Sequence, residues 1–129
     1  MMNKELGDGD SRESRDLRKR TKAFALRIVR VYQSLPETGA GQILGRQLLR
    51  SGTSVGAHYR EACRARSVAE FVSKIEGGLQ ELEETVYWME LLVEGDLLPA
   101  RRLSDLLQEA EELTAILAAS AITAKKTRR

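Results

Sequence analysis

Cysteine, proline, histidine and aromatic residues are all scarce in this sequence, and their scarcity excludes several classes of protein. A single cysteine, Cys63, excludes an intrachain disulfide and fits a reduced, cytoplasmic setting. Two prolines, Pro36 and Pro99, leave room for long uninterrupted helices. No apolar run approaches the roughly 20 residues that a membrane-spanning helix needs, and residues 1–20 lack the apolar centre of a signal peptide. We therefore expect a cytoplasmic protein with no membrane association.

The residues that carry most enzymatic chemistry are also nearly absent. His58 is the one histidine, and Cys63 follows five residues later, so on one helix their side chains diverge by about 140° and cannot form a nucleophile pair. Di-iron bundles use a glutamate three residues before a histidine, and His58 has none. Metalloprotease and phosphate-loop motifs are absent as well. We expect no enzymatic activity, no metal and no cofactor.

What the sequence does contain is helical periodicity over one domain's length, with 42% hydrophobic and 31% charged residues among 129. Four segments repeat apolar residues with the spacing of one helix face. These segments are 16–36, 41–66, 67–94 and 99–124. The third begins with Ser67 and Glu70, which have the spacing of a capping box. No segment has the pattern of a strand.

Four amphipathic helices with short connections predict an all-α fold, an antiparallel up-down-up-down four-helix bundle. The bundle is expected over residues 16–124. Residues 1–15 are polar and are expected to form a mobile tail, and residues 125–129 a basic tail.

The middle of the second segment is rich in small residues and contains Gly52 and Gly56. Glycine inside a helix costs about 1 kcal/mol relative to alanine, so two of them four residues apart require a reason. Close packing of a neighbouring helix is one explanation. A functional kink or a gap for a ligand is the alternative.

Charge is sorted along the chain. Residues 1–66 hold 14 Lys/Arg and 7 Asp/Glu, a net charge of +7. Residues 67–118 hold 3 Lys/Arg and 12 Asp/Glu, a net charge of −9, and residues 119–129 add +4. A folded bundle can therefore present separate basic and acidic faces.

The basic residues of the first two helices are candidates for binding nucleic acid, because cations near a helix N-terminus oppose the helix dipole and local stability does not explain them. The candidates are Arg18, Lys19, Arg20, Lys22, Arg27, Arg30, Arg46, Arg50, Arg60 and Arg64. The alternative is that they form ion pairs with the acidic third helix, within the chain or between subunits. The acidic residues themselves form either a solvated face or a docking face for a basic partner.

Several apolar residues fall outside the core-facing stripes of their helices. They are Leu26, Tyr87, Trp88 and Leu91. A monomer would expose them, and exposed apolar patches often mark interfaces. These four are candidates for an oligomer interface.

Particular stretches of the sequence resemble one bacterial family. They are Arg20-Thr-Lys-Ala-Phe-Ala-Leu-Arg-Ile, Ser34-Leu-Pro, Gln47-Leu-Leu-Arg-Ser-Gly-Thr-Ser-Val-Gly-Ala-His-Tyr-Arg-Glu-Ala, Ala65-Arg-Ser-Val-Ala-Glu-Phe and Glu83-Glu-Thr-Val-Tyr-Trp-Met-Glu-Leu-Leu. The family is that of the four-helix-bundle proteins encoded in intervening sequences of 23S ribosomal RNA genes, which are similar to the accessory variability proteins of diversity-generating retroelements. The resemblance covers residues 16–98.

The resemblance implies a homopentamer of four-helix bundles without known catalytic activity. It implies, from the retroelement relatives, a basic surface that binds RNA or DNA and a reverse transcriptase. Arg50 and Arg60 lie inside the shared block and are the leading positions for such binding. Two departures from the family pattern stand out, His58 in place of an expected asparagine and an acidic third helix that contains Gly77 and Gly78.

Two functions are therefore open. One is an oligomeric nucleic-acid-binding accessory protein, suggested by the basic first half and by the resemblance. The other is a protein-interaction or scaffold module whose charges serve self-assembly, suggested by the acidic segment that follows the basic one.

Overall fold

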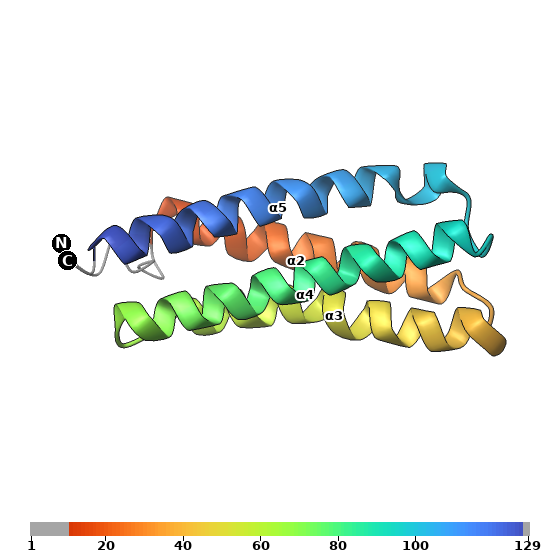
Figure 1. The fold of residues 1–129 in the computed structure, drawn as a ribbon, viewed down its shortest axis with the longest axis horizontal. Helices are drawn as coiled ribbons and strands as arrows, with labels where there is room; N and C mark the ends of the chain where they lie inside the picture. The colour runs from red at the N-terminus through yellow and green to blue at the C-terminus, as the bar shows by residue number, and fades with distance from the viewer. Residues whose placement is uncertain (1–10, 128–129) are drawn as a thin grey trace.

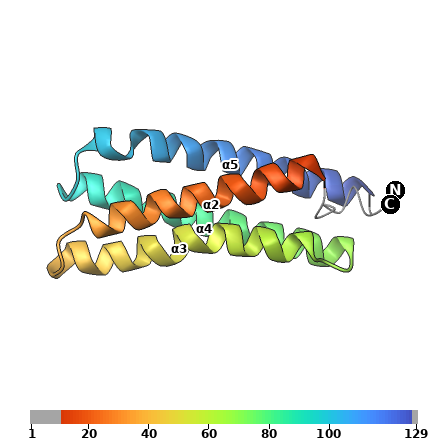
Figure 2. The ribbon, with the colours of Figure 1, turned by 180° about the vertical axis from the view of Figure 1, so that it is seen from behind.

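A computed structural model describes residues 11–127 and consists of four long α-helices, with no strand among those residues. The helices are α2 (Arg12–Gln33), α3 (Gly39–Cys63), α4 (Val68–Glu94) and α5 (Ala100–Thr127). They lie side by side with their axes roughly aligned (Figures 1 and 2). The connections after α2 and after α4 lie at one end of the molecule, and the connection after α3 lies at the other (Figure 1). The expected all-α fold of four helices is confirmed.

Helix α2 begins earlier than the sequence pattern predicted, at Arg12 rather than near Asp16. Ser11 is its N-cap, and the Ser11 hydroxyl accepts a hydrogen bond of 3.0 Å from the backbone N–H of Ser14. Residues 12–15 therefore belong to the helix and not to a polar tail. The pattern missed this turn because its buried residue, Ser14, is polar. Residues 1–10 of the expected tail lie outside the described residues.

Helix α4 begins where the capping box predicted. The Ser67 hydroxyl accepts a 3.0 Å hydrogen bond from the backbone N–H of Glu70. The Glu70 carboxylate accepts a 2.9 Å hydrogen bond from the backbone N–H of Arg66. In an ideal capping box the donor would be the backbone N–H of the N-cap residue Ser67, one residue later. The helix has 27 residues, as expected.

Helix α5 continues to Thr127, through the first residues of the expected basic tail. Ala121 and Ala124 are buried and extend the core into this last part of the helix. The Lys125 ammonium lies 3.2 Å from a carboxylate oxygen of Glu76 on α4, which ties the end of α5 to the bundle.

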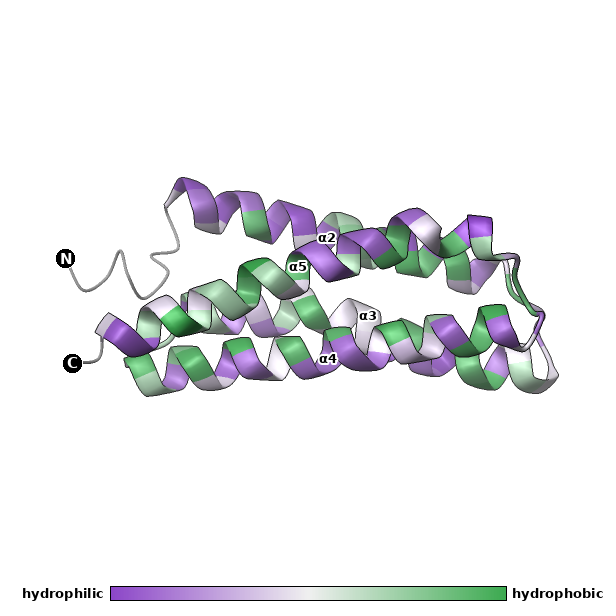
Figure 3. Ribbon diagram, turned by 45° about the horizontal axis from the view of Figure 1, so that its top comes forward, coloured by the Kyte–Doolittle hydropathy of each residue, from purple (hydrophilic) through white to green (hydrophobic). Residues whose placement is uncertain are grey.

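The core runs the length of the bundle and is made by one stripe from each helix. Hydrophobic and hydrophilic bands alternate along every helix, as amphipathic helices require (Figure 3). Large side chains with almost no exposure include Phe24, Ile28, Leu48, Ile75, Leu82, Met89, Leu103, Leu113 and Leu117. The α3–α4 interface is the most extensive and the α2–α5 interface the least.

Helices α2 and α3 approach closely where α3 carries glycine. A Cβ atom added to Gly52 would lie 2.7 Å from Cγ1 of Ile28, and one added to Gly56 would lie 3.1 Å from Oγ1 of Thr21. Both neighbours belong to α2. The small residues of α3 thus lie against α2 at these positions.

No helix in residues 11–127 combines the length and the hydropathy required to cross a bilayer.

Candidate functional site

Within residues 11–127, the ten basic candidates divide into residues that form ion pairs and residues that do not. Arg20 belongs to the first group. Its Nε lies 2.8 Å from Glu109 Oε2, and its Nη2 donates to Glu109 Oε1 at 2.9 Å and to Glu112 Oε1 at 2.6 Å. The two-pronged hydrogen bond to Glu109, aided by that to Glu112, raises the pKa of Arg20 above its usual range. This guanidinium joins α2 to α5.

Arg50 is also paired. Its Nη1 lies 3.2 Å from Oε1 of Glu81, and its Nη2 contacts the carboxylate of Glu84. Glu81 is mostly buried and lies between the Arg50 guanidinium and the His58 ring, because Nε2 of His58 is 3.7 Å from its other oxygen. Arg50, one of the two leading positions from the family resemblance, therefore joins α3 to α4.

The other eight candidates form no ion pair within residues 11–127. Their helical positions separate them further, at about 100° per residue. Arg27 shares the α5-facing side of α2 with Arg20. Lys19 and Arg30 point away from the bundle. The remaining five lie beside the junction of α2 and α3 or on the adjacent outer face of α3, and they are Arg18, Lys22, Arg46, Arg60 and Arg64.

A shallow groove of about 300 Å³ runs between α2 and α3 at the centre of this basic surface. Lys22 stands on one side of the groove and Arg60 on the other. The rest of the lining is small, and consists of Thr21, Ala25, Thr53, Gly56 and Ala57. Arg46, Arg60 and Arg64 fall within about 40° of one another around α3, on the side of Thr53, so they form one row beside the groove.

Acidic residues are few in the helices that carry the basic surface: Glu13 and Asp16 lie in the first turns of α2, and Glu61 lies near the end of α3. Between residues 17 and 60 the chain has nine Lys/Arg and one acidic residue, Glu37, which lies in the connection after α2. Glu61 follows Arg60 directly, but its carboxylate lies 3.1 Å from the ammonium of Lys74 on α4. The five cations of the α2–α3 surface are therefore not neutralised by an ion pair within residues 11–127. We call Arg18, Lys22, Arg46, Arg60 and Arg64 the α2–α3 basic surface.

His58 and Cys63 lie in separate surroundings, as their angular separation on α3 requires. The His58 ring covers Gly77 of α4, where an added Cβ would lie 2.9 Å from ring atoms Cε1 and Nδ1. The Cys63 sulfur lies 3.6 Å from the hydroxyl of Ser14 on α2. Within residues 11–127 no cluster of three His, Cys, Asp or Glu residues is arranged to hold a metal ion.

A small buried polar cluster joins the start of α2 to the end of α3, and the sequence did not indicate it. The Tyr59 hydroxyl donates to the Ser14 hydroxyl at 3.2 Å, beside Cys63. Burial raises the pKa of Tyr59 well above its usual range. The signal that could have revealed this cluster is the i, i+4 spacing of Tyr59 and Cys63 together with an unexplained serine at the start of the first helix.

The four candidates for an oligomer interface differ in exposure. Leu26 is 48% exposed and Tyr87 53% exposed. Trp88 and Leu91 are half-buried, and Trp88 packs against the core with its ring 5.1 Å from that of Tyr87, edge to face. Two further apolar residues are exposed, Ile43 and Ile122. The sequence pattern did not identify them as interface candidates, because each lies close in sequence to residues of the core.

Comparisons with known proteins agree on one family. The family model of the 23S rRNA-intervening sequence proteins matches residues 13–119. A crystal structure of a protein of unknown function from the S23 ribosomal protein family of Bacteroides thetaiotaomicron is 32% identical to this chain, with a TM-score of 0.74. The match covers 81% of this chain and 96% of that one. A search of curated proteins found no match.

Proposed function

The chain belongs to the family of 23S rRNA-intervening sequence proteins, and we propose that it is a non-enzymatic protein that binds RNA or DNA through its α2–α3 basic surface. In this proposal the helices form an antiparallel up-down-up-down bundle, and several copies assemble, five if the chain follows its resemblance to the retroelement accessory proteins. That resemblance also supports the choice of nucleic acid as the ligand.

The observation that carries the proposal is a set of cations on one surface that form no ion pair with any other residue of the described range 11–127. Arg20 and Arg50 are held by glutamates of α5 and α4, so their charge is largely used within the chain. Arg60 differs from Arg50 in having no such partner in residues 11–127 and in lining the groove. Arg60 is accordingly the leading binding residue, and Arg50 becomes a structural one.

The chemistry of this surface suits phosphate groups better than base edges. Lysine and arginine side chains on both sides of a groove can contact a phosphate backbone from two directions. The α3 residues between the two cations are small, namely Thr53, Gly56 and Ala57, so a phosphate backbone can approach the groove closely. Phosphate contacts carry no sequence information, and binding should therefore tolerate any sequence and weaken steeply with salt.

The test is fluorescence anisotropy with mixed-sequence RNA and DNA duplexes at several salt concentrations. The double variant Lys22→Glu/Arg60→Glu should weaken binding to every sequence. It should also flatten the slope of log K against log salt by about 0.9 for each phosphate that the variant no longer neutralises. The matched control is Arg101→Glu/Lys126→Glu, which makes the same change in net charge on exposed residues of α5. The control should retain the slope of the unmodified protein.

Two results would contradict the proposal. One is an absence of binding at low salt. The other is an equal loss of affinity in both double variants, which would mean that net charge alone, and not the α2–α3 basic surface, attracts the nucleic acid.

The scaffold function is a second candidate, and the interhelical ion pairs favour it. The pairs Arg20–Glu109 and Arg50–Glu84 show that part of the sorted charge serves contacts between helices of the chain. If all of it serves assembly, oligomers form without any affinity for nucleic acid, and the anisotropy measurement distinguishes the two functions.

A further inference from the structure

We propose that the groove between α4 and α5 receives helix α2 of a second copy of this chain, with Leu26 in the groove and Lys19 and Arg30 against its acidic rim. This inference rests on the self-assembly included in the proposed function and adds the two surfaces that meet. It involves neither the arginines of the α2–α3 basic surface nor nucleic acid.

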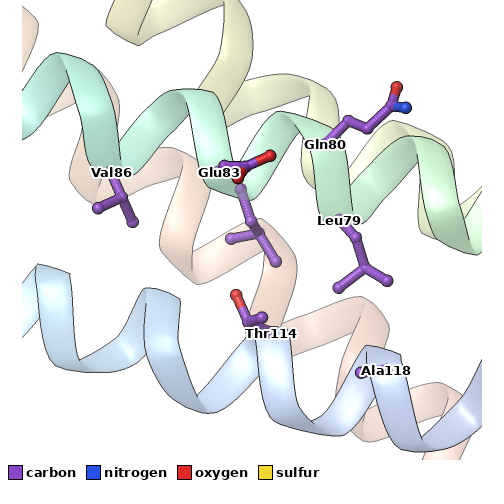
Figure 4. A pocket seen from close by; sticks show the side chains of 7 residues that line it. Leu79, Gln80, Glu83, Val86, Thr114 and Ala118 are labelled. Carbon is purple, nitrogen blue, oxygen red and sulfur yellow. The ribbon is translucent and has the colours of Figure 1, made fainter.

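The α4–α5 groove is an open apolar depression of about 480 Å³. Leu79 and Val86 of α4 point across it toward Thr114 and Ala118 of α5 (Figure 4). Leu82 is fully buried beneath it. Ile122, which is 55% exposed, lies one turn beyond Ala118 and extends the apolar surface. An apolar side chain from a partner would leave water on entering this groove.

The rim of the groove is acidic, and its carboxylates have no cationic partner among the described residues. Glu83 is exposed at the edge of the groove (Figure 4). Glu90 follows about two turns later on the same side of α4, and Glu111 precedes Thr114 by about one turn on α5. None of the three forms an ion pair with another residue in the range 11–127. The rim therefore favours a cationic partner.

The outer ridge of α2 has the complementary arrangement. Leu26 is 48% exposed on the side of α2 opposite to the buried Phe24 and Ile28. Lys19 lies about two turns before Leu26 and Arg30 about one turn after it, on the same face. Both cations lack an ion pair within the described part of the chain. An apolar side chain between two cations thus matches an apolar groove between carboxylates.

This ridge is distinct from the α2–α3 basic surface. At about 100° per residue, the mean direction of Lys19, Leu26 and Arg30 is turned by roughly a quarter of the helix circumference from the mean direction of Arg18 and Lys22, and Lys22, one turn before Leu26, lies at the border between the two surfaces. A second copy on the ridge therefore leaves the row of arginines on α3 open to solvent.

The proposed contact joins two different surfaces, so it is heterologous. Each copy that fills a neighbour's α4–α5 groove still has its own groove free. Contacts of this kind continue from copy to copy and close into a ring where the rotation allows it.

The test uses light scattering coupled to gel filtration, with circular dichroism to verify folding. Leu26→Glu blocks the ridge and Thr114→Arg blocks the groove, and both residues are exposed, so the bundle should remain folded. Each variant alone should fall to the mass of one chain, 14.4 kDa. An equimolar mixture should form a species of two chains, because the intact ridge of one variant fits the intact groove of the other. Glu83→Arg is a second groove variant, and it should behave as Thr114→Arg does.

The matched control is Ile43→Glu, which places the same charge on an exposed apolar residue of α3 that is outside both surfaces. It should keep the mass of the unmodified assembly. The inference is overturned if Leu26→Glu and Thr114→Arg remain assembled, or if their mixture contains only single chains. An unmodified protein of 14.4 kDa at micromolar concentration would overturn it together with the assembly part of the proposed function. Binding to nucleic acid is measured separately and can fail or succeed independently.

Discussion

Gly52 and Gly56 occupy equivalent places on α3 but face different neighbours on α2. The space for a Cβ at Gly52 is blocked by the branched, fully buried side chain of Ile28, whose three methyl and methylene carbons would lie within 3.1 Å. The space at Gly56 is limited mainly by the Thr21 hydroxyl, at 3.1 Å. Close packing against α2 therefore requires glycine at position 52 more strongly than at position 56.

We predict different outcomes for alanine at these two positions. Gly52→Ala should lower the free energy of unfolding, because overpacking typically costs about 1–3 kcal/mol and exceeds the gain of about 1 kcal/mol in helix propensity. Gly56→Ala should be near neutral, since a small shift of Thr21 is enough. Urea denaturation of both variants measures the difference. Equal stability of the two would show that Ile28 moves aside without cost.

The burial of individual polar residues in the core could not be predicted from the sequence. Thr21 and Thr85 are fully buried, and each hydroxyl is satisfied by a backbone carbonyl one turn earlier in its own helix. Such local satisfaction makes a threonine compatible with a core, but it leaves no trace in a hydropathy pattern. The contact between His58 and Gly77 is a different case. Both residues depart from the family pattern, and the packing of α3 on α4 shows that one accommodates the other.

Helix boundaries were predictable wherever a cap had a recognisable sequence. The start of α4 followed from Ser67 and Glu70, and its length from an apolar stripe that ends at Gly95. The start of α2 has an equally good cap, Ser11, but the first turn lacks an apolar residue and could not be distinguished from a polar tail. The α2–α3 groove also required the structure, because periodicity defines the buried face of a helix and not its neighbour.

The cap of α4 provides a prediction at the scale of the element. Ser67→Ala removes the acceptor for the N–H of Glu70, and loss of an N-cap side chain costs about 1 kcal/mol. Thermal unfolding should show the lower melting temperature. Ser73→Ala is the control, because Ser73 is an exposed residue within the same helix and alanine has the higher helix propensity there. A drop in melting temperature in Ser73→Ala as large as that in Ser67→Ala would contradict the role of the cap.

Across the whole molecule, the sorted charge of the sequence becomes a division between α2–α3 and α4–α5. The sequence predicted separate basic and acidic faces but could not say which cations remain available. The packing of the helices determines which cations are paired. Arg20 forms an ion pair with Glu109 of α5 and Arg50 with Glu81 of α4, whereas Arg60 forms no ion pair within residues 11–127. Spacing along one helix cannot supply this information, since each partner belongs to another helix.

The last prediction separates cations that hold the bundle together from cations that serve a ligand. Arg20→Gln should lower the free energy of unfolding by about 1 kcal/mol, near the upper limit for exposed pairs, because the bond to the partly buried Glu109 is two-pronged. Arg60→Gln should leave stability unchanged and weaken nucleic-acid binding instead. Glutamine resembles arginine in helix propensity, so the comparison isolates the charge. Urea denaturation and anisotropy on both variants measure the two effects, and the destabilisation in Arg20→Gln should shrink at high salt because salt screens the pair. If Arg60→Gln destabilises the bundle as much as Arg20→Gln does, Arg60 is a structural residue and the α2–α3 basic surface loses its leading member.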